Sequence, residues 1–301
     1  MPDWTIQRLL AWITGYFTDK KVDSPRLSAE LLLASTLAMS RIELYTQFDK
    51  IVPQDKLVYL RRLVKRASQN EPVAYLIGKT EFYSIELDVT ADCLIPRPET
   101  ELLVETAVDF LRKRTGKQLV CDLCTGCGCI AVAVAKNFAK ADIIATDISE
   151  TALKVAEKNV EKYKLSDRIK LLLGDLFDPL IEQIDAAKFD LIVCNPPYVS
   201  RPDYQSLEKN VKDFEPQQAL YGGDDGLDVY RKIALKVDDF LKPDGALILE
   251  IGCGQGQAVR ELLEKTSVFS DIKIGKDFQN NDRIVIARKT ANNYNDKVNM
   301  L

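Results

Sequence analysis

The hydrophobic pattern of the chain changes near Pro72, and the change separates two parts of different structure. Over residues 4–70 the apolar positions recur at helical spacing, which predicts a small helical domain that we place at residues 1–71. After it, polar and apolar residues alternate in residues 81–89, a pattern typical of half-buried strands. We therefore expect a short β-hairpin within a linker of residues 72–95.

From residue 96 onwards, helical stretches alternate with short apolar runs. Strands that alternate with helices build βαβ units, so residues 96–290 are expected to form a mostly parallel sheet with helices on both faces. Ligands of such sheets bind beyond the carboxyl ends of the strands, where the strand order reverses. The polar stretch 291–301 is predicted to be a flexible tail. The runs that predict strands are Leu119–Leu123, Ile143–Ala145, Ile169–Leu173, Leu191–Cys194, Ala246–Ile251 and Ile284–Ala287.

The composition is that of a globular protein, and it excludes several classes of function. The 301 residues, 46% of them hydrophobic, suffice for two domains with a substantial core. Because the chain contains no histidine, it can hold no His general base, Ser-His-Asp triad or His-ligated metal. Its net charge of -4 lacks the basic field of nucleic-acid binders, which favours a protein or small-molecule partner and no direct nucleic acid.

The sequence predicts neither export nor a membrane span. The N-terminus has no basic stretch followed by an apolar run, and no uncharged stretch is long enough to cross a bilayer. We therefore expect a soluble, cytoplasmic protein that works without a membrane.

Four of the seven cysteines crowd into one short segment at the end of a predicted strand, where disulfides among them would be badly strained. They are Cys121, Cys124, Cys127 and Cys129. The C-x2-C-x2-C spacing also occurs in iron–sulfur and zinc sites. Against a metal, alternate strand residues point to opposite faces, and no second group of ligands follows. We predict reduced thiols that fill a packed turn, and no metal.

The same segment is a glycine-rich turn between a strand and a helix. Gly126 and Gly128 would let the backbone turn sharply and approach a ligand, with helix N–H groups facing it. The next two strands end in Asp147 and Asp175, and the first of these acids could accept hydrogen bonds from a ribose diol. These positions predict a nucleoside pocket. Taken alone, the loop fits an NAD-type site as well as an S-adenosylmethionine site.

A fourth predicted strand runs directly into Asn195, Pro196, Pro197 and Tyr198. The two prolines remove backbone donors and hold the chain extended, which leaves the carbonyls available as acceptors. A planar amide or amino nitrogen could donate one hydrogen to the Asn195 side-chain oxygen and the other to the Pro196 backbone oxygen. Its face would then point to a neighbouring electrophile, with Tyr198 packed over the planar group.

Together, the loop of residues 122–128, the two strand-end acids and the Asn-Pro-Pro-Tyr tetrapeptide resemble class I S-adenosylmethionine-dependent methyltransferases that act on planar sp2 nitrogens. Residues 94–101 and 214–227 resemble signatures of the HemK/PrmC family, the peptide chain release factor glutamine N5-methyltransferases. The resemblance spans about residues 5–289. It implies an α/β, Rossmann-like class I methyltransferase fold with a mostly parallel seven-stranded sheet, a short β linker and a small N-terminal helical domain that recognises the substrate.

The resemblance also implies roles for individual residues. The cofactor would be S-adenosyl-L-methionine, its product S-adenosyl-L-homocysteine, and no metal would take part. Asn195, Pro196, Pro197 and Tyr198 would bind the substrate and carry out catalysis. Arg97 would lie at the opening of the site and also bind the substrate. The implied cofactor-binding residues are Cys124, Thr125, Gly126, Cys127 and Gly128 at the methionine part, Asp147 at the ribose, Asp175 and Leu176 at the adenine, and Asn195. One departure is Cys124, which stands where the family often has glycine.

The reaction that the resemblance implies is methyl transfer to the side-chain amide nitrogen (N5) of the glutamine in the Gly-Gly-Gln (GGQ) motif of class I release factors, by an enzyme expected to be monomeric. A glutamine of a ribosomal protein is an alternative substrate, since the catalytic residues do not distinguish the two. A DNA adenine N6-methyltransferase could use the same tetrapeptide; the acidic charge opposes it, and the basic run 61–66 is its best support. A relic domain without activity is the remaining alternative.

Overall fold

The computed structural model describes residues 3–183 and 188–290. The predicted tail, residues 291–301, lies outside these described residues. By packing, the chain divides into two compact units. Each unit has a hydrophobic core of its own, and each is described separately below.

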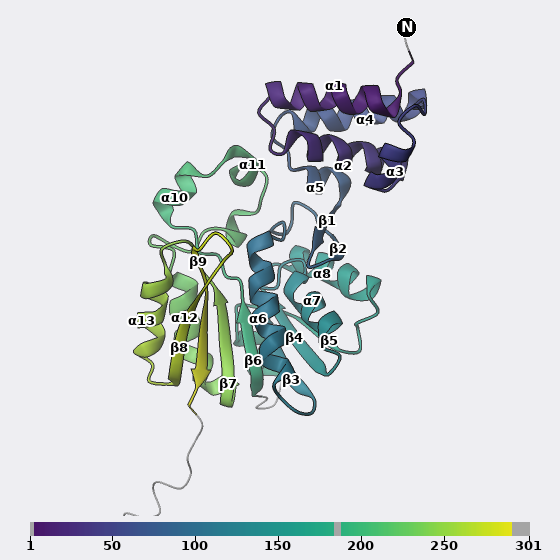
Figure 1. The fold of residues 1–301 in the computed structure, drawn as a ribbon. Coiled ribbons are helices and arrows are strands. Elements are labelled where there is room, and N and C mark those ends of the chain that lie inside the picture. The colour runs from purple at the N-terminus through teal and green to yellow at the C-terminus, as the bar shows by residue number, and fades with distance from the viewer. Residues whose placement is uncertain (1–2, 184–187, 291–301) are drawn as a thin grey trace, which may run out of the picture. The chain divides into compact units, whose positions relative to one another are not determined.

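The two units are not two consecutive stretches of sequence. The first combines Met1–Lys79 with the short segment Glu208–Phe214, and the second combines Thr80–Leu207 with Glu215–Leu301. Figure 1 shows the first unit as a bundle of helices and the second as a sheet covered by helices. The chain therefore leaves the second unit once, after Leu207, and returns to it at Glu215.

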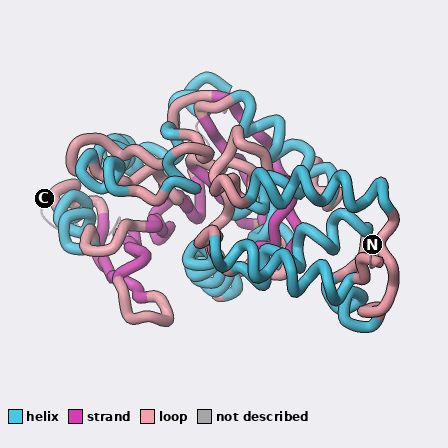
Figure 2. Tube along the Cα trace, turned by 90° about the horizontal axis from the view of Figure 1, so that it is seen from above, coloured by secondary structure: helices cyan, strands magenta, loops and turns pink. Residues whose placement is uncertain are grey.

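Helices build most of the core of the first unit, as the apolar spacing predicts, and they are cyan in Figure 2. The third of them begins with a capping box, in which Ser40 and Glu43 satisfy each other's backbone N–H groups. The side chains of Ile6, Leu33 and Leu44 meet in the buried core. The helices are α1 (Ile6–Asp19), α2 (Pro25–Leu37), α3 (Arg41–Thr46), α4 (Gln54–Ala67) and α5 (Val73–Ile77), with the single-turn α11 (Lys209–Lys212) from the later segment.

The predicted hairpin is confirmed as a two-stranded sheet of β1 (Lys79–Phe82) and β2 (Ile85–Asp88). Two residues connect the strands, Tyr83 with φ +49° and Ser84 with φ +57°. Positive φ at both positions is typical of the tight turns whose twist matches that of a hairpin. Phe82 then turns inward and joins the core of the second unit.

A seven-stranded sheet of order β5-β4-β3-β6-β7-β9-β8 forms the centre of the second unit (Figure 1). Neighbouring strands from β5 to β7 pair in parallel, whereas β9 runs antiparallel to both β7 and β8. The mostly parallel sheet is therefore confirmed. The strands are β3 (Gln118–Leu123), β4 (Ala141–Asp147), β5 (Ile169–Leu173), β6 (Phe189–Cys194), β7 (Leu241–Glu250), β8 (Phe269–Lys276) and β9 (Asp282–Lys289).

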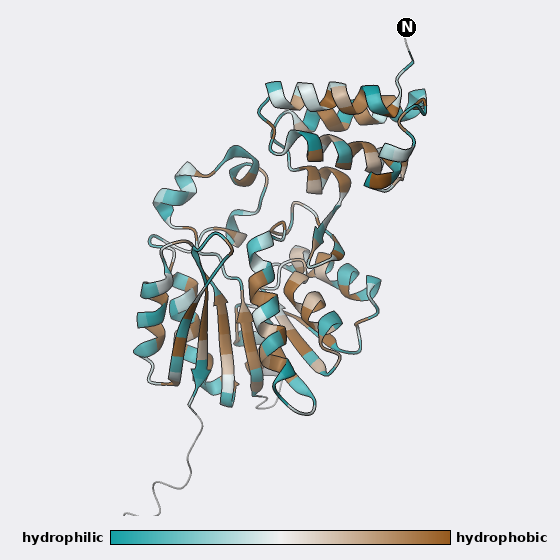
Figure 3. Cartoon of the chain, viewed as in Figure 1, coloured by the Kyte–Doolittle hydropathy of each residue, from teal (hydrophilic) through white to brown (hydrophobic). Residues whose placement is uncertain are grey.

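Helices cover both faces of this sheet, and each face has its own apolar cluster. The strands are predominantly hydrophobic, which Figure 3 shows in brown, because both of their faces are buried. One cluster includes residues of α6 (Glu101–Arg112), α7 (Cys129–Asn137) and α8 (Glu150–Lys162). The other includes residues of α9 (Asp178–Gln183), α12 (Asp228–Phe240) and α13 (Gly256–Glu264). The short helices η1 (Pro98–Thr100), α10 (Arg201–Ser206) and η2 (Gln217–Ala219) lie in connecting segments.

One strand, β8, has no counterpart among the six apolar runs read from the sequence. It lies at the edge of the sheet and pairs only with β9. An edge strand is half exposed, so Ile272 and Ile274 alternate with the polar Asp271 and Lys273 instead of forming a continuous run. The seventh strand was implied only by the family resemblance, and the structure confirms it.

Candidate active site

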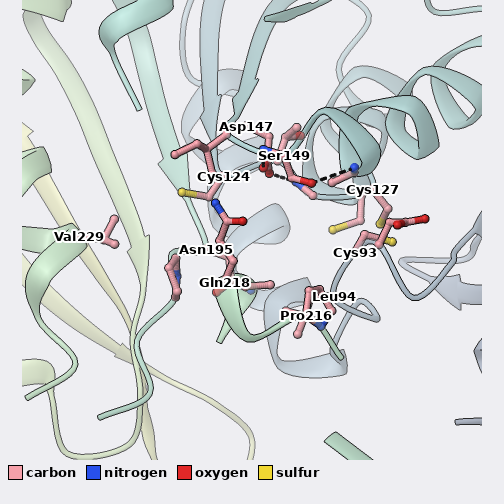
Figure 4. Close-up of a pocket in the computed structure, with 18 of the residues that line it drawn as sticks. Cys93, Leu94, Cys124, Cys127, Asp147, Ser149, Asn195, Pro216, Gln218 and Val229 are labelled. Atoms are coloured by element: carbon pink, nitrogen blue, oxygen red, sulfur yellow. Dashed lines mark hydrogen bonds between the residues drawn. The ribbon is translucent and has the colours of Figure 1, made fainter. Parts of the chain in front are cut away.

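A cavity of about 600 Å³ opens at the carboxyl ends of the central strands. The strand order reverses here, since the chain runs from β3 outward to β5 and then returns to β6 on the other side of β3. Figure 4 shows Cys124, Asp147 and Asn195 around this common space. Of the predicted site residues, the cavity is lined by Cys124, Thr125, Gly126, Cys127, Asp147, Asp175, Leu176, Asn195 and Pro197. Gly128, Pro196, Tyr198 and Arg97 are not part of its lining.

A buried carboxylate at its base holds the glycine-rich loop in shape. Asp122 Oδ2 accepts hydrogen bonds from the Thr125 hydroxyl at 2.6 Å and from the Ala131 N–H at 3.1 Å. Burial raises the pKa of Asp122 to about 7 although both bonds favour its charged form. Gly128 adopts φ +80°, and a Cβ there would approach the Cβ of Ala156 to 3.2 Å. The turn into α7 therefore depends on this acid and on a glycine.

Cys124 takes up the left-handed backbone conformation, with φ +57°. A side chain there costs on the order of 1 kcal/mol, which glycine would not incur. The Cys124 thiol lines the cavity, and burial together with Cys124 raises the pKa of the buried Cys194 thiol. Cys124 thus adopts the same turn as glycine would, with some backbone strain, and adds a sulfur atom to the cavity wall.

Asp147 is the last residue of β4, and its carboxylate connects the glycine-rich loop to the start of α8. Its two carboxylate oxygens accept the N–H groups of Gly126 at 2.7 Å and Ser149 at 2.9 Å. Burial raises the pKa of this carboxyl, and the two backbone bonds act in the opposite direction. Ser149, not Asp147, caps α8, because its hydroxyl accepts the Ala152 N–H. Asp147 is therefore positioned at the cavity by backbone donors, with its remaining lone pairs free for a ligand.

Asp175 follows β5 at the rim of the cavity and forms an ion pair. Its Oδ2 atom lies 2.8 Å from Lys232 Nζ of α12, and both side chains are partly exposed. Leu176 beside it is buried and adopts φ +50°. The backbone turns sharply at this strand end, because Gly174 directs its N–H to the Asp147 carbonyl at 2.9 Å. The strand ends of β4 and β5 are thus linked at the cavity.

Asn195 directly follows β6, and one end of its side-chain amide is fixed. Its Nδ2 atom donates a hydrogen bond to the Thr100 hydroxyl at 3.2 Å. Thr100 is buried and also lines the cavity. Since the nitrogen faces Thr100, the Oδ1 atom is left to accept hydrogen bonds from a ligand. Pro197 lines the cavity beside it.

Tyr198 directs its hydroxyl to Glu250 at the end of β7, where it lies 3.5 Å from Oε1. Burial raises the pKa of the Tyr198 phenol, and burial likewise raises the pKa of Glu250 to about 7. The Tyr230 hydroxyl donates to the Glu250 backbone carbonyl at 2.8 Å. The packing of Tyr198 over a planar substrate group stays a prediction.

Arg97 forms an ion pair with Glu215, which is almost completely buried. Glu215 also accepts the N–H of Ile95 at 3.2 Å. This pair joins the two segments, residues 94–101 and 214–227, that carried the family resemblance beyond the nucleoside loop. A substrate contact by Arg97 stays a prediction.

All seven cysteines are free thiols. Cys93, Cys124, Cys127 and Cys129 line the cavity. Hydrogen bonding to Cys127 together with burial raises the pKa of the Cys93 thiol. Within residues 3–183 and 188–290, the structure contains no group of three or more His, Cys, Asp or Glu side chains arranged to hold a metal ion.

Several residues at the site were not found by reasoning from the sequence. Lys232 belongs to a helix far along the chain and carried no signal, whereas Glu250 ends an apolar strand in an acid, as Asp147 does. Thr100 and Gln218 lay inside the two segments that resembled family signatures. Gln218, together with Gln217, lines the cavity. The signal was therefore a strand-end acid for Glu250 and membership of a signature segment for Thr100 and Gln218.

A Rossmann-like sheet, a glycine-rich loop after its first parallel strand and an Asn-Pro-Pro-Tyr strand end at one cavity define a class I methyltransferase. The domain family described as "PrmC N-terminal domain" matches residues 8–78, and the "Methyltransferase small domain" matches residues 98–212. The release factor glutamine methyltransferase of Rhodopirellula baltica is 42% identical over 95% of this chain and 97% of that protein. That of Geobacter sulfurreducens is 39% identical, again over 95% and 97%. The chain belongs to the release factor glutamine methyltransferase family.

Among solved structures, the release factor-specific protein-(glutamine-N5) methyltransferase from Alicyclobacillus acidocaldarius is 28% identical. It covers 68% of this chain and 99% of that chain, with a TM-score of 0.41. In the part of the chain that the structure describes, no helix is both long and apolar enough to cross a membrane.

Proposed function

We propose that this enzyme transfers a methyl group from S-adenosyl-L-methionine to the side-chain amide nitrogen of the glutamine in the GGQ motif of class I release factors. The observation that carries the proposal is Asn195, whose amide is tethered through its nitrogen so that its oxygen is left to accept an N–H at the cavity. A glutamine amide offers two such hydrogens in one plane. The printed names of the relatives support release factors as the substrate.

The cavity fits a nucleoside-containing cofactor. Its volume of about 600 Å³ lies within the usual range for small-molecule sites. A Cβ built on Gly126 would meet no protein atom within 4 Å, so the loop leaves open space beside its backbone. When bound, the cofactor supplies a sulfonium methyl group as the electrophile. We assign the loop from Cys124 to Gly128 to its methionine part, Asp147 to the ribose, and Asp175 with Leu176 to the adenine.

Catalysis then rests on positioning, because an amide nitrogen is a poor nucleophile and the chain has no histidine to deprotonate it. Asn195 Oδ1 and the Pro196 carbonyl would each accept one amide hydrogen and aim the nitrogen at the methyl group. The same two oxygens would stabilise the positive charge that develops on the nitrogen. The proton leaves after the transfer, to water.

The N-terminal helical domain of residues 1–71, which lies within the first unit, is assigned to recognition of the release factor, and the hairpin linker of residues 72–95 follows it. The catalytic domain of residues 96–290 needs no metal in this scheme. Release factors act on ribosomes in the cytoplasm, so the proposal places a monomeric enzyme there, without direct contacts to nucleic acid or membrane.

A competition experiment tests the proposal. Purified enzyme and S-adenosylmethionine are mixed with equal amounts of release factor, ribosomal proteins and duplex DNA, and the products are analysed by peptide and nucleoside mass spectrometry. We expect one methyl group on the GGQ glutamine alone. Methylation of a ribosomal protein or of adenine instead would refute the assigned substrate.

Asn195→Ala provides the matched mechanistic test. The variant is expected to lose about 100-fold or more in kcat, comparable to removal of an oxyanion donor, while its Kd for S-adenosylhomocysteine changes little. Turnover equal to that of the wild type would refute the role of Asn195.

A further inference from the structure

Two glutamine side chains lie at the rim of the cavity. Gln217 and Gln218 belong to the short helix η2, and both line the cavity that Asn195 also lines. We propose that these two amides are substrate-binding residues, which hydrogen-bond with the backbone of the two glycines that precede the substrate glutamine. The inference rests on the proposed function, because it concerns how the GGQ motif of the release factor is held.

The chemistry of the substrate motif limits how an enzyme can bind it. Glycine has no side chain, so two consecutive glycines offer an enzyme only their backbone N–H and C=O groups and the space around them. In an extended segment, each residue directs its N–H and its C=O to the same side. The carboxamide of glutamine carries both a donor and an acceptor, so one such side chain can satisfy both groups of one extended residue.

The amides of Gln217 and Gln218 are available for bonds of this kind. Both residues are exposed, and among the described residues neither side-chain amide has a hydrogen-bond partner. The acids of the cavity already have partners, since Asp147 accepts two backbone N–H groups and Asp175 pairs with Lys232. The two glutamines are therefore polar groups of the rim that remain open to a ligand.

The backbone on both sides of η2 is fixed relative to the site. Before η2, the buried Glu215 forms an ion pair with Arg97. After it, Tyr221 forms a parallel β-bridge with Val199, which follows Asn195 by four residues. The two glutamines are thus carried by a segment that is anchored at both ends, so little conformational freedom is lost when they bind a substrate.

The segment that follows η2 approaches the Asn-Pro-Pro-Tyr residues closely. A Cβ built on Gly222 would lie 2.5 Å from the Pro197 carbonyl oxygen and 2.8 Å from the Tyr198 Cα, so only glycine fits there without displacement. Figure 4 shows Gln218 and Asn195 together at the cavity. A polypeptide that inserts its glutamine at Asn195 therefore passes close to η2, and the residues just before that glutamine are the ones within reach of the two amides.

Leucine substitutions test the two amides. Gln217→Leu and Gln218→Leu retain most of the side-chain volume and remove its hydrogen-bonding groups, and the double variant removes both amides. The control is Gln257→Leu on α13, an exposed glutamine that donates to Glu261 and lies outside the cavity lining. The readouts are kcat and KM with the intact release factor, the Kd of S-adenosylhomocysteine and the melting temperature.

We expect each single variant to raise the KM for the release factor about tenfold, the effect of losing one or two net hydrogen bonds, and the double variant to raise it further. The value of kcat should change less than KM, because Asn195 still orients the substrate amide. The Kd of S-adenosylhomocysteine and the melting temperature should stay at their wild-type values, since the exposed amides contact only the protein substrate.

Three results would overturn the proposal. They are a double variant with the wild-type KM, a rise in KM of the same size in Gln257→Leu, and a raised Kd of S-adenosylhomocysteine with an unchanged KM. The last of these would assign the amides to the cofactor. Absence of glutamine methylation by the wild-type enzyme would instead refute the proposed function.

An ester substitution in the substrate tests the backbone contact directly. A release factor assembled by chemical ligation with glycolic acid in place of one of the two glycines lacks that backbone N–H. We expect the wild-type enzyme to lose about fivefold in kcat/KM with at least one of the two esters, and the Gln217→Leu/Gln218→Leu enzyme to show no further loss. An equal loss in both enzymes, or no loss in the wild type, would contradict the inference.

Discussion

Replacement of Arg97 by methionine is expected to destabilise the second unit by about 3 kcal/mol. The Glu215 side chain is 1% exposed and accepts hydrogen bonds from Arg97 and from the Ile95 N–H. Without the guanidinium, a buried carboxylate keeps a single backbone donor. Breaking a buried pair by removal of one partner costs about 3–5 kcal/mol. The Arg97 side chain is 30% exposed, so solvent weakens the pair, and we take the lower end of this range.

Urea unfolding followed by circular dichroism at neutral pH measures this loss. Trp4 and Trp12 are the two tryptophans of the chain and both belong to the first unit, so tryptophan fluorescence follows that unit separately. The double variant Arg97→Met/Glu215→Gln removes both charges and is expected to recover most of the lost stability, because no buried charge is left unpaired.

A loss below about 1 kcal/mol in Arg97→Met would refute this reasoning, and so would a double variant no more stable than the single one. The same proteins also test the substrate contact expected for Arg97. If the double variant regains stability but keeps a raised KM for the release factor, Arg97 contacts the substrate in addition to its ion pair with Glu215. If KM returns to the wild-type value, the ion pair accounts for the effect of the substitution.

Two further predictions concern the glycine-rich loop. Gly128→Ala should lower the free energy of unfolding by about 1–2 kcal/mol, because the φ of +80° is unfavourable for alanine and the new Cβ crowds Ala156. A melting temperature equal to the wild-type value would contradict this prediction. Asp122 has a pKa of about 7 when folded, above its unfolded value, so the unfolded chain releases this proton first and stability falls as the pH rises from about 4 to about 7. The free energy of unfolding, measured with urea across this pH range, should fall less in Asp122→Asn than in the wild type, by up to about 4 kcal/mol. A variant whose stability depends on pH as steeply as that of the wild type would refute the assignment.

The fold could largely be predicted from the sequence, because its strands are buried on both faces and read as apolar runs. The edge strand β8 was not predicted, since its isoleucines Ile272 and Ile274 alternate with charged residues. The hairpin was predicted from its alternation, although the left-handed turn at Tyr83 and Ser84 carries no glycine that would have marked it.

In the candidate site, too, local features of the sequence could be predicted and long-range contacts could not. Residues at strand ends, such as Asp147 and Asn195, could be predicted because a strand and its end are local features of the sequence. Their partners could not: Thr100 reaches Asn195 across 95 positions of the chain, and Lys232 reaches Asp175 across 57. Such pairs are set by the order and register of the sheet, which spacing along the sequence does not encode.

Because the first unit is built from two separate segments of the chain, the protein cannot be divided into its two units by a single cut. Because Glu208–Phe214 packs with the first unit, a cut at Lys79 does not separate two modules. A truncated catalytic fragment would retain this stretch as a loop without the helices on which it packs. A chimaera that exchanges the first unit between relatives must therefore graft two segments, the N-terminal helices and this short insertion.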